Sequence, residues 1–145
     1  MDKWDSRFLD ISKLVSSWSK DKRTKVGAVI VCGRNPISFG FNGFPVGCDD
    51  NIMERYEAPK KYFWTIHSEA NAIIQAAKNG QKTDGCDIYV NLFPCANCAG
   101  LIVNAGIKRV FCEAKPDFNH ERWGESWKIA HTIFTEAKVE IIYLN

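Results

Sequence analysis

Two short motifs carry side chains that could bind a metal ion and move a proton. Segment 67–69 (His-Ser-Glu) precedes an apolar stretch with helical spacing, and segment 94–98 (Pro-Cys-Ala-Asn-Cys) precedes a second one. One imidazole and two thiolates can hold Zn²⁺ with one position open for water, whereas a structural zinc site usually has four protein ligands. Glu69 is badly placed to be a further ligand but well placed to contact that water. We therefore predict a catalytic zinc site with Glu69 as its proton-transferring residue and with the ligands His67, Cys95 and Cys98.

Helix geometry explains the spacing of the ligands. If each motif begins a helix, the positive end of the helix dipole favours a thiolate over a thiol. Cys95 and Cys98 then share one helix face, and Pro94 is tolerated at a first turn. Taken singly, a Cys-x-x-Cys motif is often a redox pair or half of a structural zinc site, and His-x-Glu occurs by chance. Because each motif occurs once and each precedes a helical pattern, one joint metal site is favoured.

Composition and charge limit the classes of protein. The chain has 145 residues, of which 46% are hydrophobic and 25% charged, which predicts a single globular domain over residues 1–145. A net charge of +2 gives little attraction for a polyanion, so we expect a small anionic substrate and no long nucleic acid. The chain lacks an apolar run of the roughly 20 residues that span a bilayer and lacks an apolar signal core. We therefore expect no membrane partner and a cytoplasmic location.

The six cysteines do not suggest disulfide bonds by their placement. Cys32, Cys86 and Cys112 lie in or beside apolar strand-like runs, which favours buried free thiols. Cys48 lies in a polar loop, where a free thiol is favoured over a second metal ligand.

The hydrophobic pattern alternates between helix and strand. We expect Asp5 or Ser6 to cap a first helix that ends before Lys20. Turn residues 33–36 predict an antiparallel hairpin, and a helix between the last two strands predicts that they run parallel. The length of segment 42–63 predicts a functional loop. The expected strands are 26–31, 37–41, 87–91, 109–112 and 139–144, and the later helices are 67–79, 95–105 and 121–137. The pattern predicts an α/β fold, a five-stranded mixed sheet with helices on both faces.

Segment 65–73, which carries His67 and Glu69, together with the cysteine pair, resembles the cytidine deaminase superfamily. Segments 25–30, 40–48 and 105–110 are similar to deoxycytidylate (dCMP) deaminases, and the match covers roughly residues 5 to 145. The resemblance implies a three-layer α/β/α cytidine-deaminase-like fold. It also implies hydrolytic deamination of dCMP to dUMP with release of ammonia, which would supply dUMP for thymidylate synthesis. One departure is Ser68, where the family usually has alanine; we expect it to be tolerated because its backbone would face the base.

The resemblance also implies roles for individual residues. One zinc ion per subunit, held by the three ligands named above, would lower the pKa of a bound water toward neutrality. Glu69 would take the proton of that water, pass it to ring nitrogen N3 and finally protonate the leaving amine. Asn42 would hydrogen-bond the sugar or the base, and Ser68 would line the base site.

The predicted phosphate contacts are Arg23, before the first strand, and Lys115, after the fourth, although either could be a solvated surface charge. Phe44 could stack on a base, and packing explains it equally well. The resemblance extends to a regulatory triphosphate site, with dCTP as activator, dTTP as inhibitor and Mg²⁺ on the triphosphate. Its candidate residues are Gly43, Gly47, Asp49 and Asp50. That loop could equally serve as a pocket lid.

The family resemblance suggests a homo-oligomer, a trimer or a hexamer. Three other functions stay open. The first is deamination of another cytosine nucleotide or nucleoside, such as dCTP, CMP or deoxycytidine. A tRNA adenosine deaminase is less favoured, because the sequence shows no basic strip for an RNA stem. The third is a non-catalytic, zinc-stabilised binding module.

Overall fold

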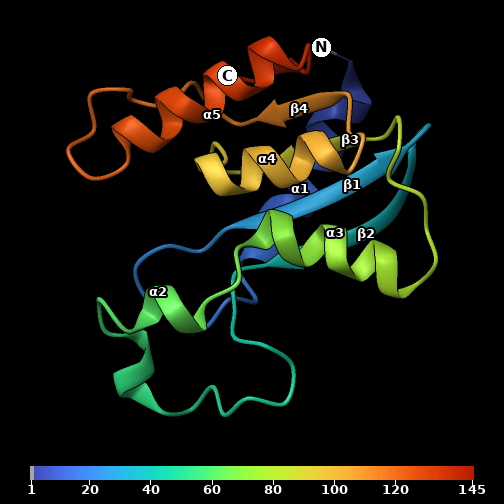
Figure 1. Ribbon diagram of the computed structural model, residues 1–145. Coiled ribbons are helices and arrows are strands. Elements are labelled where there is room, and N and C mark those ends of the chain that lie inside the picture. The colour runs from blue at the N-terminus through green and yellow to red at the C-terminus, as the bar shows by residue number, and fades with distance from the viewer. Residues whose placement is uncertain (1) are drawn as a thin grey trace.

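A mixed sheet forms the centre of the computed structural model, which describes residues 2–145 (Figure 1). Within that range the sheet has five strands in the order β2-β1-β3-β4-β5. The strands are β1 (Gly27–Cys32), β2 (Asn35–Phe41), β3 (Asp87–Val90), β4 (Arg109–Cys112) and β5 (Glu140–Tyr143). β1 runs antiparallel to β2 and β3, whereas β3, β4 and β5 are parallel. The mixed sheet and its parallel last pair of strands are confirmed.

Helices cover both faces of this sheet (Figure 1). These helices are α1 (Lys3–Ser16), α3 (Ser68–Lys78), α4 (Ala96–Asn104) and α5 (Gly124–Glu136), whereas the one-turn α2 (Lys61–Trp64) lies away from the sheet. Residues of α1 pack on one face, and residues of α3, α4 and α5 pack on the other. The expected three-layer α/β/α fold is therefore confirmed.

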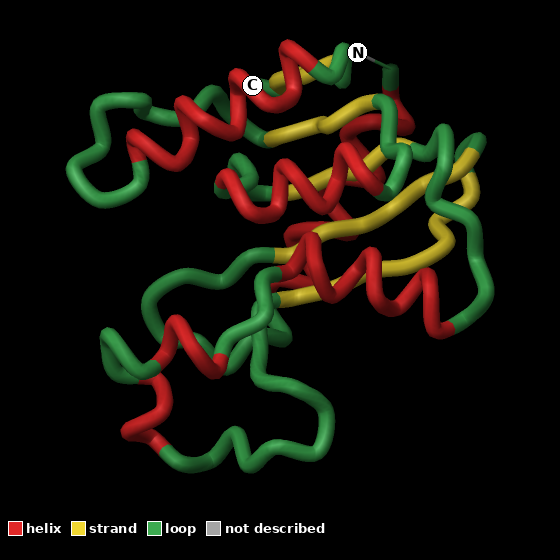
Figure 2. Tube along the Cα trace, in the orientation of Figure 1, coloured by secondary structure: helices red, strands yellow, loops and turns green. Residues whose placement is uncertain are grey.

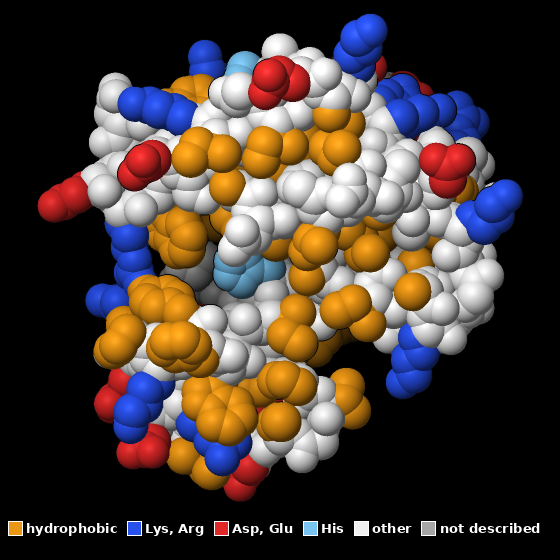
Figure 3. Space-filling view, viewed as in Figure 1, with side chains coloured by type: hydrophobic (Ala, Val, Ile, Leu, Met, Phe, Trp, Pro, Cys, Tyr) orange, Lys and Arg blue, Asp and Glu red, His pale blue; other side chains and the backbone are white. Residues whose placement is uncertain are grey.

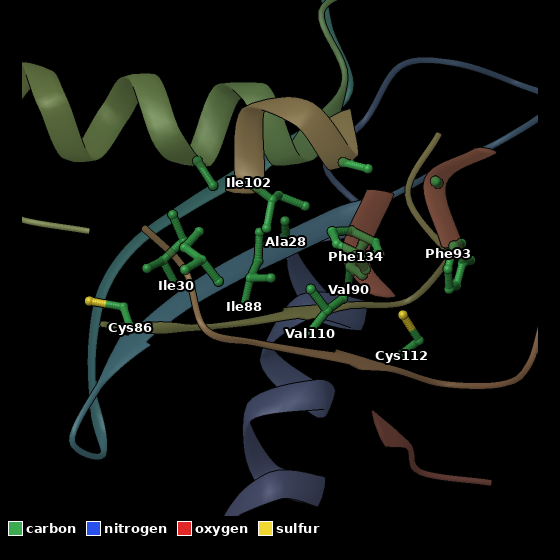
Figure 4. Packing of buried hydrophobic residues seen from close by; sticks show 14 of the residues in the cluster. Ala28, Ile30, Cys86, Ile88, Val90, Phe93, Ile102, Val110, Cys112 and Phe134 are labelled. Atoms are coloured by element: carbon green, nitrogen blue, oxygen red, sulfur yellow. The ribbon is translucent and has the colours of Figure 1, made fainter. Parts of the chain in front are cut away.

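β1 shows why the sheet needs a layer on each side. Ala28 and Ile30 belong to the cluster under α3, α4 and α5, which Figure 4 shows, and Val29 and Val31 pack with residues of α1. Successive strand residues point to opposite faces, so an unbroken apolar run is buried on both. This burial fixes β1 between the two helical layers.

Local signals explain two differences from the expected boundaries. α1 begins earlier than predicted, because the Asp2 carboxylate accepts hydrogen bonds from the backbone N–H groups of Trp4 and Asp5 and forms a capping box with Asp5. Capping by Asp5 or Ser6 was therefore wrong. The turn between β1 and β2 is shorter than predicted: Gly33 and Arg34 both have positive φ, as in a tight hairpin turn, and β2 begins immediately after them.

The prediction of free thiols at Cys32 and Cys86 was wrong, because these residues form a disulfide bond. The register of the sheet explains it. Val31 pairs with Asp87 in the antiparallel β1–β3 ladder, so the next residue of β1 lies opposite the residue that precedes β3. Their Cα atoms are 4.7 Å apart, which is within the range that a disulfide requires. Cys112 is buried and free, as predicted, and Cys48 is an exposed free thiol.

The segment between β2 and α3 extends away from the sheet (Figure 2). It was predicted as a loop, but it also contains α2 and a 3₁₀ turn, Met53–Tyr56. An antiparallel bridge between Gly43 and Ile66 closes its base. Both ends of the segment therefore reach the start of α3. Every helix within residues 2–145 is too short or too polar to cross a bilayer.

Candidate active site

The two chemical motifs meet where α3 and α4 begin. His67 is the N-cap residue of α3, and Cys95 is the N-cap residue of α4. Neither side chain caps its own helix, so both are available to a ligand. His67 Nδ1 lies 3.4 Å from Cys95 Sγ and 3.5 Å from Cys98 Sγ. The fold thus brings together the three predicted metal ligands.

These donor atoms fit Zn²⁺. Zinc–nitrogen bonds of about 2.0 Å and zinc–sulfur bonds of about 2.3 Å, at a tetrahedral angle, place nitrogen and sulfur about 3.5 Å apart. The three ligand atoms here lie within 4.8 Å of one another, and both nitrogen–sulfur separations match that value. Hydrogen bonds from the Cys98 thiol and the His67 ring lower the pKa of Cys95 and favour the thiolate that a metal needs.

Glu69 lies beside this cluster and is 4% exposed. It lines the same cavity as His67 and Cys95. Burial raises the pKa of its carboxyl above the ordinary value. A carboxyl with a raised pKa can both accept and return a proton near neutral pH, which suits an acid–base group. Glu69 Oε1 accepts a hydrogen bond of 2.6 Å from Ser68 Oγ, so the Ser68 side chain contacts the acid–base group.

The cavity has a volume of about 120 Å³ and opens to solvent. Figure 3 shows this face hollowed, with a histidine ring in the hollow and hydrophobic side chains around it. Its walls include the apolar side chains of Leu92, Phe93, Trp123 and Trp127. Trp127 is buried, and its indole N–H donates to the Phe93 carbonyl. Both tryptophans therefore shape this cavity.

Asn42 lines the cavity and is buried. Its side-chain oxygen accepts from the N–H of Val26 at 2.9 Å, and its amide nitrogen donates to the carbonyl of Thr24 at 2.8 Å. These bonds join the segment that precedes β1 to the end of β2. Asn42 thus holds the cavity wall in place, and its second amide hydrogen is the donor that a substrate could use.

Besides Glu69, the charged residues of the cavity come from three separate segments. Arg23 lines it, as do Asp21, Lys61 and Arg122. Lys61 Nζ lies 3.0 Å from Asp21 Oδ2. The Arg122 guanidinium lies over the Tyr62 ring, 5.0 Å from its centroid. The sequence indicated Arg23 but gave no signal for Lys61 or Arg122, because only the fold brings α2 and the loop before α5 together.

Two predicted contacts lie elsewhere. Lys115 lines a neighbouring hollow with Glu113 and His120, and its Nζ is 6.0 Å from the centroid of the Phe118 ring. Phe44 stacks on Tyr56 with ring centroids 4.5 Å apart. Phe44 is therefore explained by packing within the segment before α3, and the structure does not bring Lys115 to the cavity.

The candidate regulatory residues belong to the segment that extends from the sheet. Asp50 pairs with Lys20 at 2.8 Å, and the Asp49 carboxylate accepts from the Asn51 N–H. Gly47 has a φ of 89°, which a glycine adopts without strain. Gly43 forms the bridge to Ile66. These contacts organise the loop itself.

Fold and site together define a zinc-dependent deaminase of the α/β/α type. A family model described as the cytidine and deoxycytidylate deaminase zinc-binding region matches residues 2–114. The chain belongs to this family, and the expected enzyme class, a hydrolytic deaminase, is confirmed.

Individual proteins agree with this assignment. A protein of Aliivibrio fischeri described as an uncharacterized deaminase in the luxG 3′ region is 42% identical over 142 residues, covering 98% of this chain and 94% of that protein. Human deoxycytidylate deaminase is 41% identical over 113 residues, which cover 74% of this chain but only 62% of the human protein. The apo crystal structure of dCMP deaminase from cyanophage S-TIM5 has a TM-score of 0.79 and 25% identity, covering 99% of this chain and 100% of that one.

Proposed function

We propose that this protein hydrolyses dCMP to dUMP and ammonia, and so supplies dUMP for thymidylate synthesis. The observation that carries the proposal is the cluster of His67, Cys95 and Cys98 beside the buried carboxyl of Glu69, in a cavity with cationic side chains. The resemblance to deoxycytidylate deaminases supports the choice of base and sugar. The cations at the cavity support a 5′-phosphate.

In the proposed mechanism His67, Cys95 and Cys98 would hold Zn²⁺, which when bound would supply the acidification of a water molecule. Glu69 accepts a proton from that water while the water oxygen adds to C4 of cytosine. Glu69 then delivers the proton to N3 and, after taking the second, protonates the departing amine. One water is consumed, the C4–N bond breaks, and dUMP and ammonia leave. Burial raises the pKa of the Glu69 carboxyl, a direction that suits a group that both accepts and returns a proton.

Other residues position the substrate. The walls formed by Leu92, Phe93 and Trp123 exclude water from the base. Asn42 offers its remaining amide hydrogen to the sugar or base. Arg23 and Arg122 supply the phosphate contacts in this proposal, and both can present a planar pair of donors to phosphate oxygens.

A deamination assay over a substrate panel tests this function. Ammonia release is measured with dCMP, CMP, deoxycytidine, dCTP and an adenine nucleotide. We expect the highest kcat/KM with dCMP, and a value at least about 100-fold lower with deoxycytidine, because the charge-assisted phosphate bonds are lost. Equal turnover of deoxycytidine would contradict recognition of the 5′-phosphate. Turnover of the adenine nucleotide alone would show that the base is adenine and not cytosine.

Regulation and assembly are further parts of the proposal. We propose that dCTP activates and dTTP inhibits at the loop containing Gly43, Gly47, Asp49 and Asp50, with Mg²⁺ on the triphosphate, in a cytoplasmic homo-oligomer. The resemblance of this loop to dCMP deaminases supports it. Rate curves against dCMP concentration with and without dCTP, together with the mass in solution, test these points. Superimposable rate curves with and without dCTP would contradict the proposed regulatory site.

A further inference from the structure

The hydroxyl of Ser68 donates its hydrogen bond to the catalytic carboxyl and does not cap the N-terminus of the helix. Ser68 is the first residue of α3 and is fully buried. A serine beside a helix N-terminus often caps a backbone N–H. Here its Oγ instead donates to Glu69 Oε1 at 2.6 Å. This length is typical of a strong O–H to carboxylate hydrogen bond.

The start of α3 is held firmly, which fixes where this hydroxyl can lie. Gly40 of β2 packs against the Ser68 carbonyl and the Ala72 N–H so closely that a Cβ atom there would clash with both. Ser38 Oγ donates to the Ala72 carbonyl at 2.8 Å, and Asn71 Nδ2 donates to the Phe41 carbonyl at 2.8 Å. The first turn of α3 is thus joined to β2 through Ser68, Asn71 and Ala72.

We propose that Ser68 is a positioning residue for Glu69, holding the carboxylate through Oε1 so that Oε2 is the oxygen that transfers protons. This rests on the proposed role of Glu69 in deamination. The last torsion of a glutamate side chain is broad, so an unrestrained carboxylate samples many orientations. A hydrogen bond to one oxygen from a fixed helix residue selects one of them. Because a general base must lie within hydrogen-bond reach of its proton, the restraint acts on turnover.

The Ser68 hydroxyl is expected to act on the chemical step and not on substrate binding. Ser68 contacts Glu69 through its hydroxyl, so its removal should affect the proton-transfer steps and leave substrate affinity nearly unchanged. Alanine removes a single oxygen and introduces no new group into the buried space. Ser38 provides a matched control, because its buried hydroxyl also bonds α3 but contacts a backbone carbonyl instead of Glu69.

The experiment compares the zinc-loaded parent with Ser68→Ala and Ser38→Ala. For each protein we would measure zinc content, the unfolding midpoint, and kcat and KM for dCMP or for whichever base the parent deaminates. For Ser68→Ala we expect kcat to fall about tenfold, KM to change less than twofold and zinc content to stay the same. For Ser38→Ala we expect kcat within twofold of the parent, because the contacts of Gly40 and Asn71 still hold the start of α3. A loss of kcat below threefold in Ser68→Ala, or an equal loss in Ser38→Ala, would overturn the assignment.

A crystal structure of each zinc-loaded protein gives a readout independent of turnover. We expect one orientation of the Glu69 carboxylate in the parent and in Ser38→Ala, and more than one in Ser68→Ala. The same single orientation in Ser68→Ala would contradict the positioning role. If the parent released no ammonia from any substrate, the proposed function would fail, while these structures would still decide what Ser68 does.

Discussion

Lys61 Nζ lies 3.0 Å from Asp21 Oδ2, and both residues line the cavity that contains the metal ligands. The pair is well shielded, with side chains 11% and 8% exposed. Burial alone would raise the pKa of Asp21, but the Arg23 N–H and the Lys61 ammonium outweigh it and lower that pKa. Asp21 therefore remains ionised at neutral pH and places a negative charge near Arg23.

Replacing Lys61 should weaken substrate binding. In Lys61→Met the Asp21 carboxylate loses its counter-charge and repels a phosphate nearby, so we expect KM for dCMP to rise about tenfold or more, with a smaller change in kcat. Steady-state kinetics measure this. Lys60→Met is the matched control, because Lys60 is an exposed neighbour paired with Glu54 at 3.8 Å. An equal rise of KM in both variants would contradict a specific role for Lys61.

Replacing the acid–base group should separate zinc binding from catalysis. In Glu69→Gln the side chain keeps its size but cannot accept the proton of water. We expect kcat to fall by about 10³-fold or more while one zinc ion per chain is retained. Metal analysis and an ammonia assay check the two halves of this prediction. A fully active Glu69→Gln protein would exclude the proposed mechanism.

Removal of one thiolate should abolish the metal site. We expect Cys98→Ala to purify with much less than one zinc per chain and to lose activity, because two ligands hold zinc far more weakly than three. The exposed thiol of Cys48 provides the control, and Cys48→Ser should keep a full complement of zinc. Retention of stoichiometric zinc by Cys98→Ala would show that the ion is held elsewhere.

Loss of the disulfide should reduce stability without changing the chemistry. Cys32 and Cys86 close a loop with a sequence separation of 54 residues. By loop-closure entropy we expect Cys32→Ala/Cys86→Ala to lose about 4 kcal/mol of unfolding free energy, measured in urea at equilibrium. Cys112→Ala is a buried cysteine control outside this bond. Unchanged stability, together with six alkylatable thiols instead of four in the denatured, unreduced parent, would show that the bond does not form in solution.

The metal-binding motifs of the site are encoded locally and can be predicted from the amino-acid sequence. His67 and Cys95 each precede a helix in the chain, and a helix start orients its N-cap residue in a predictable way. Hydrophobic period and turn residues were likewise enough for the strands and the order of the elements. The capping box of Asp2 and Asp5 is also encoded locally, although the apolar pattern from Phe8 onward favours a later start of α1.

The contacts between residues far apart in sequence depend on the tertiary structure. Lys61 and Arg122 join Arg23 at the cavity because α2 and the loop before α5 fold over the same helix ends, while Lys115 lies in the neighbouring hollow. Cys32 and Cys86 pair because of the register between β1 and β3, which a one-residue shift would destroy. Side-chain partners depend on packing between segments far apart in sequence. For the same reason, the contact between Ser68 and Glu69 depends on β2, which holds the start of α3.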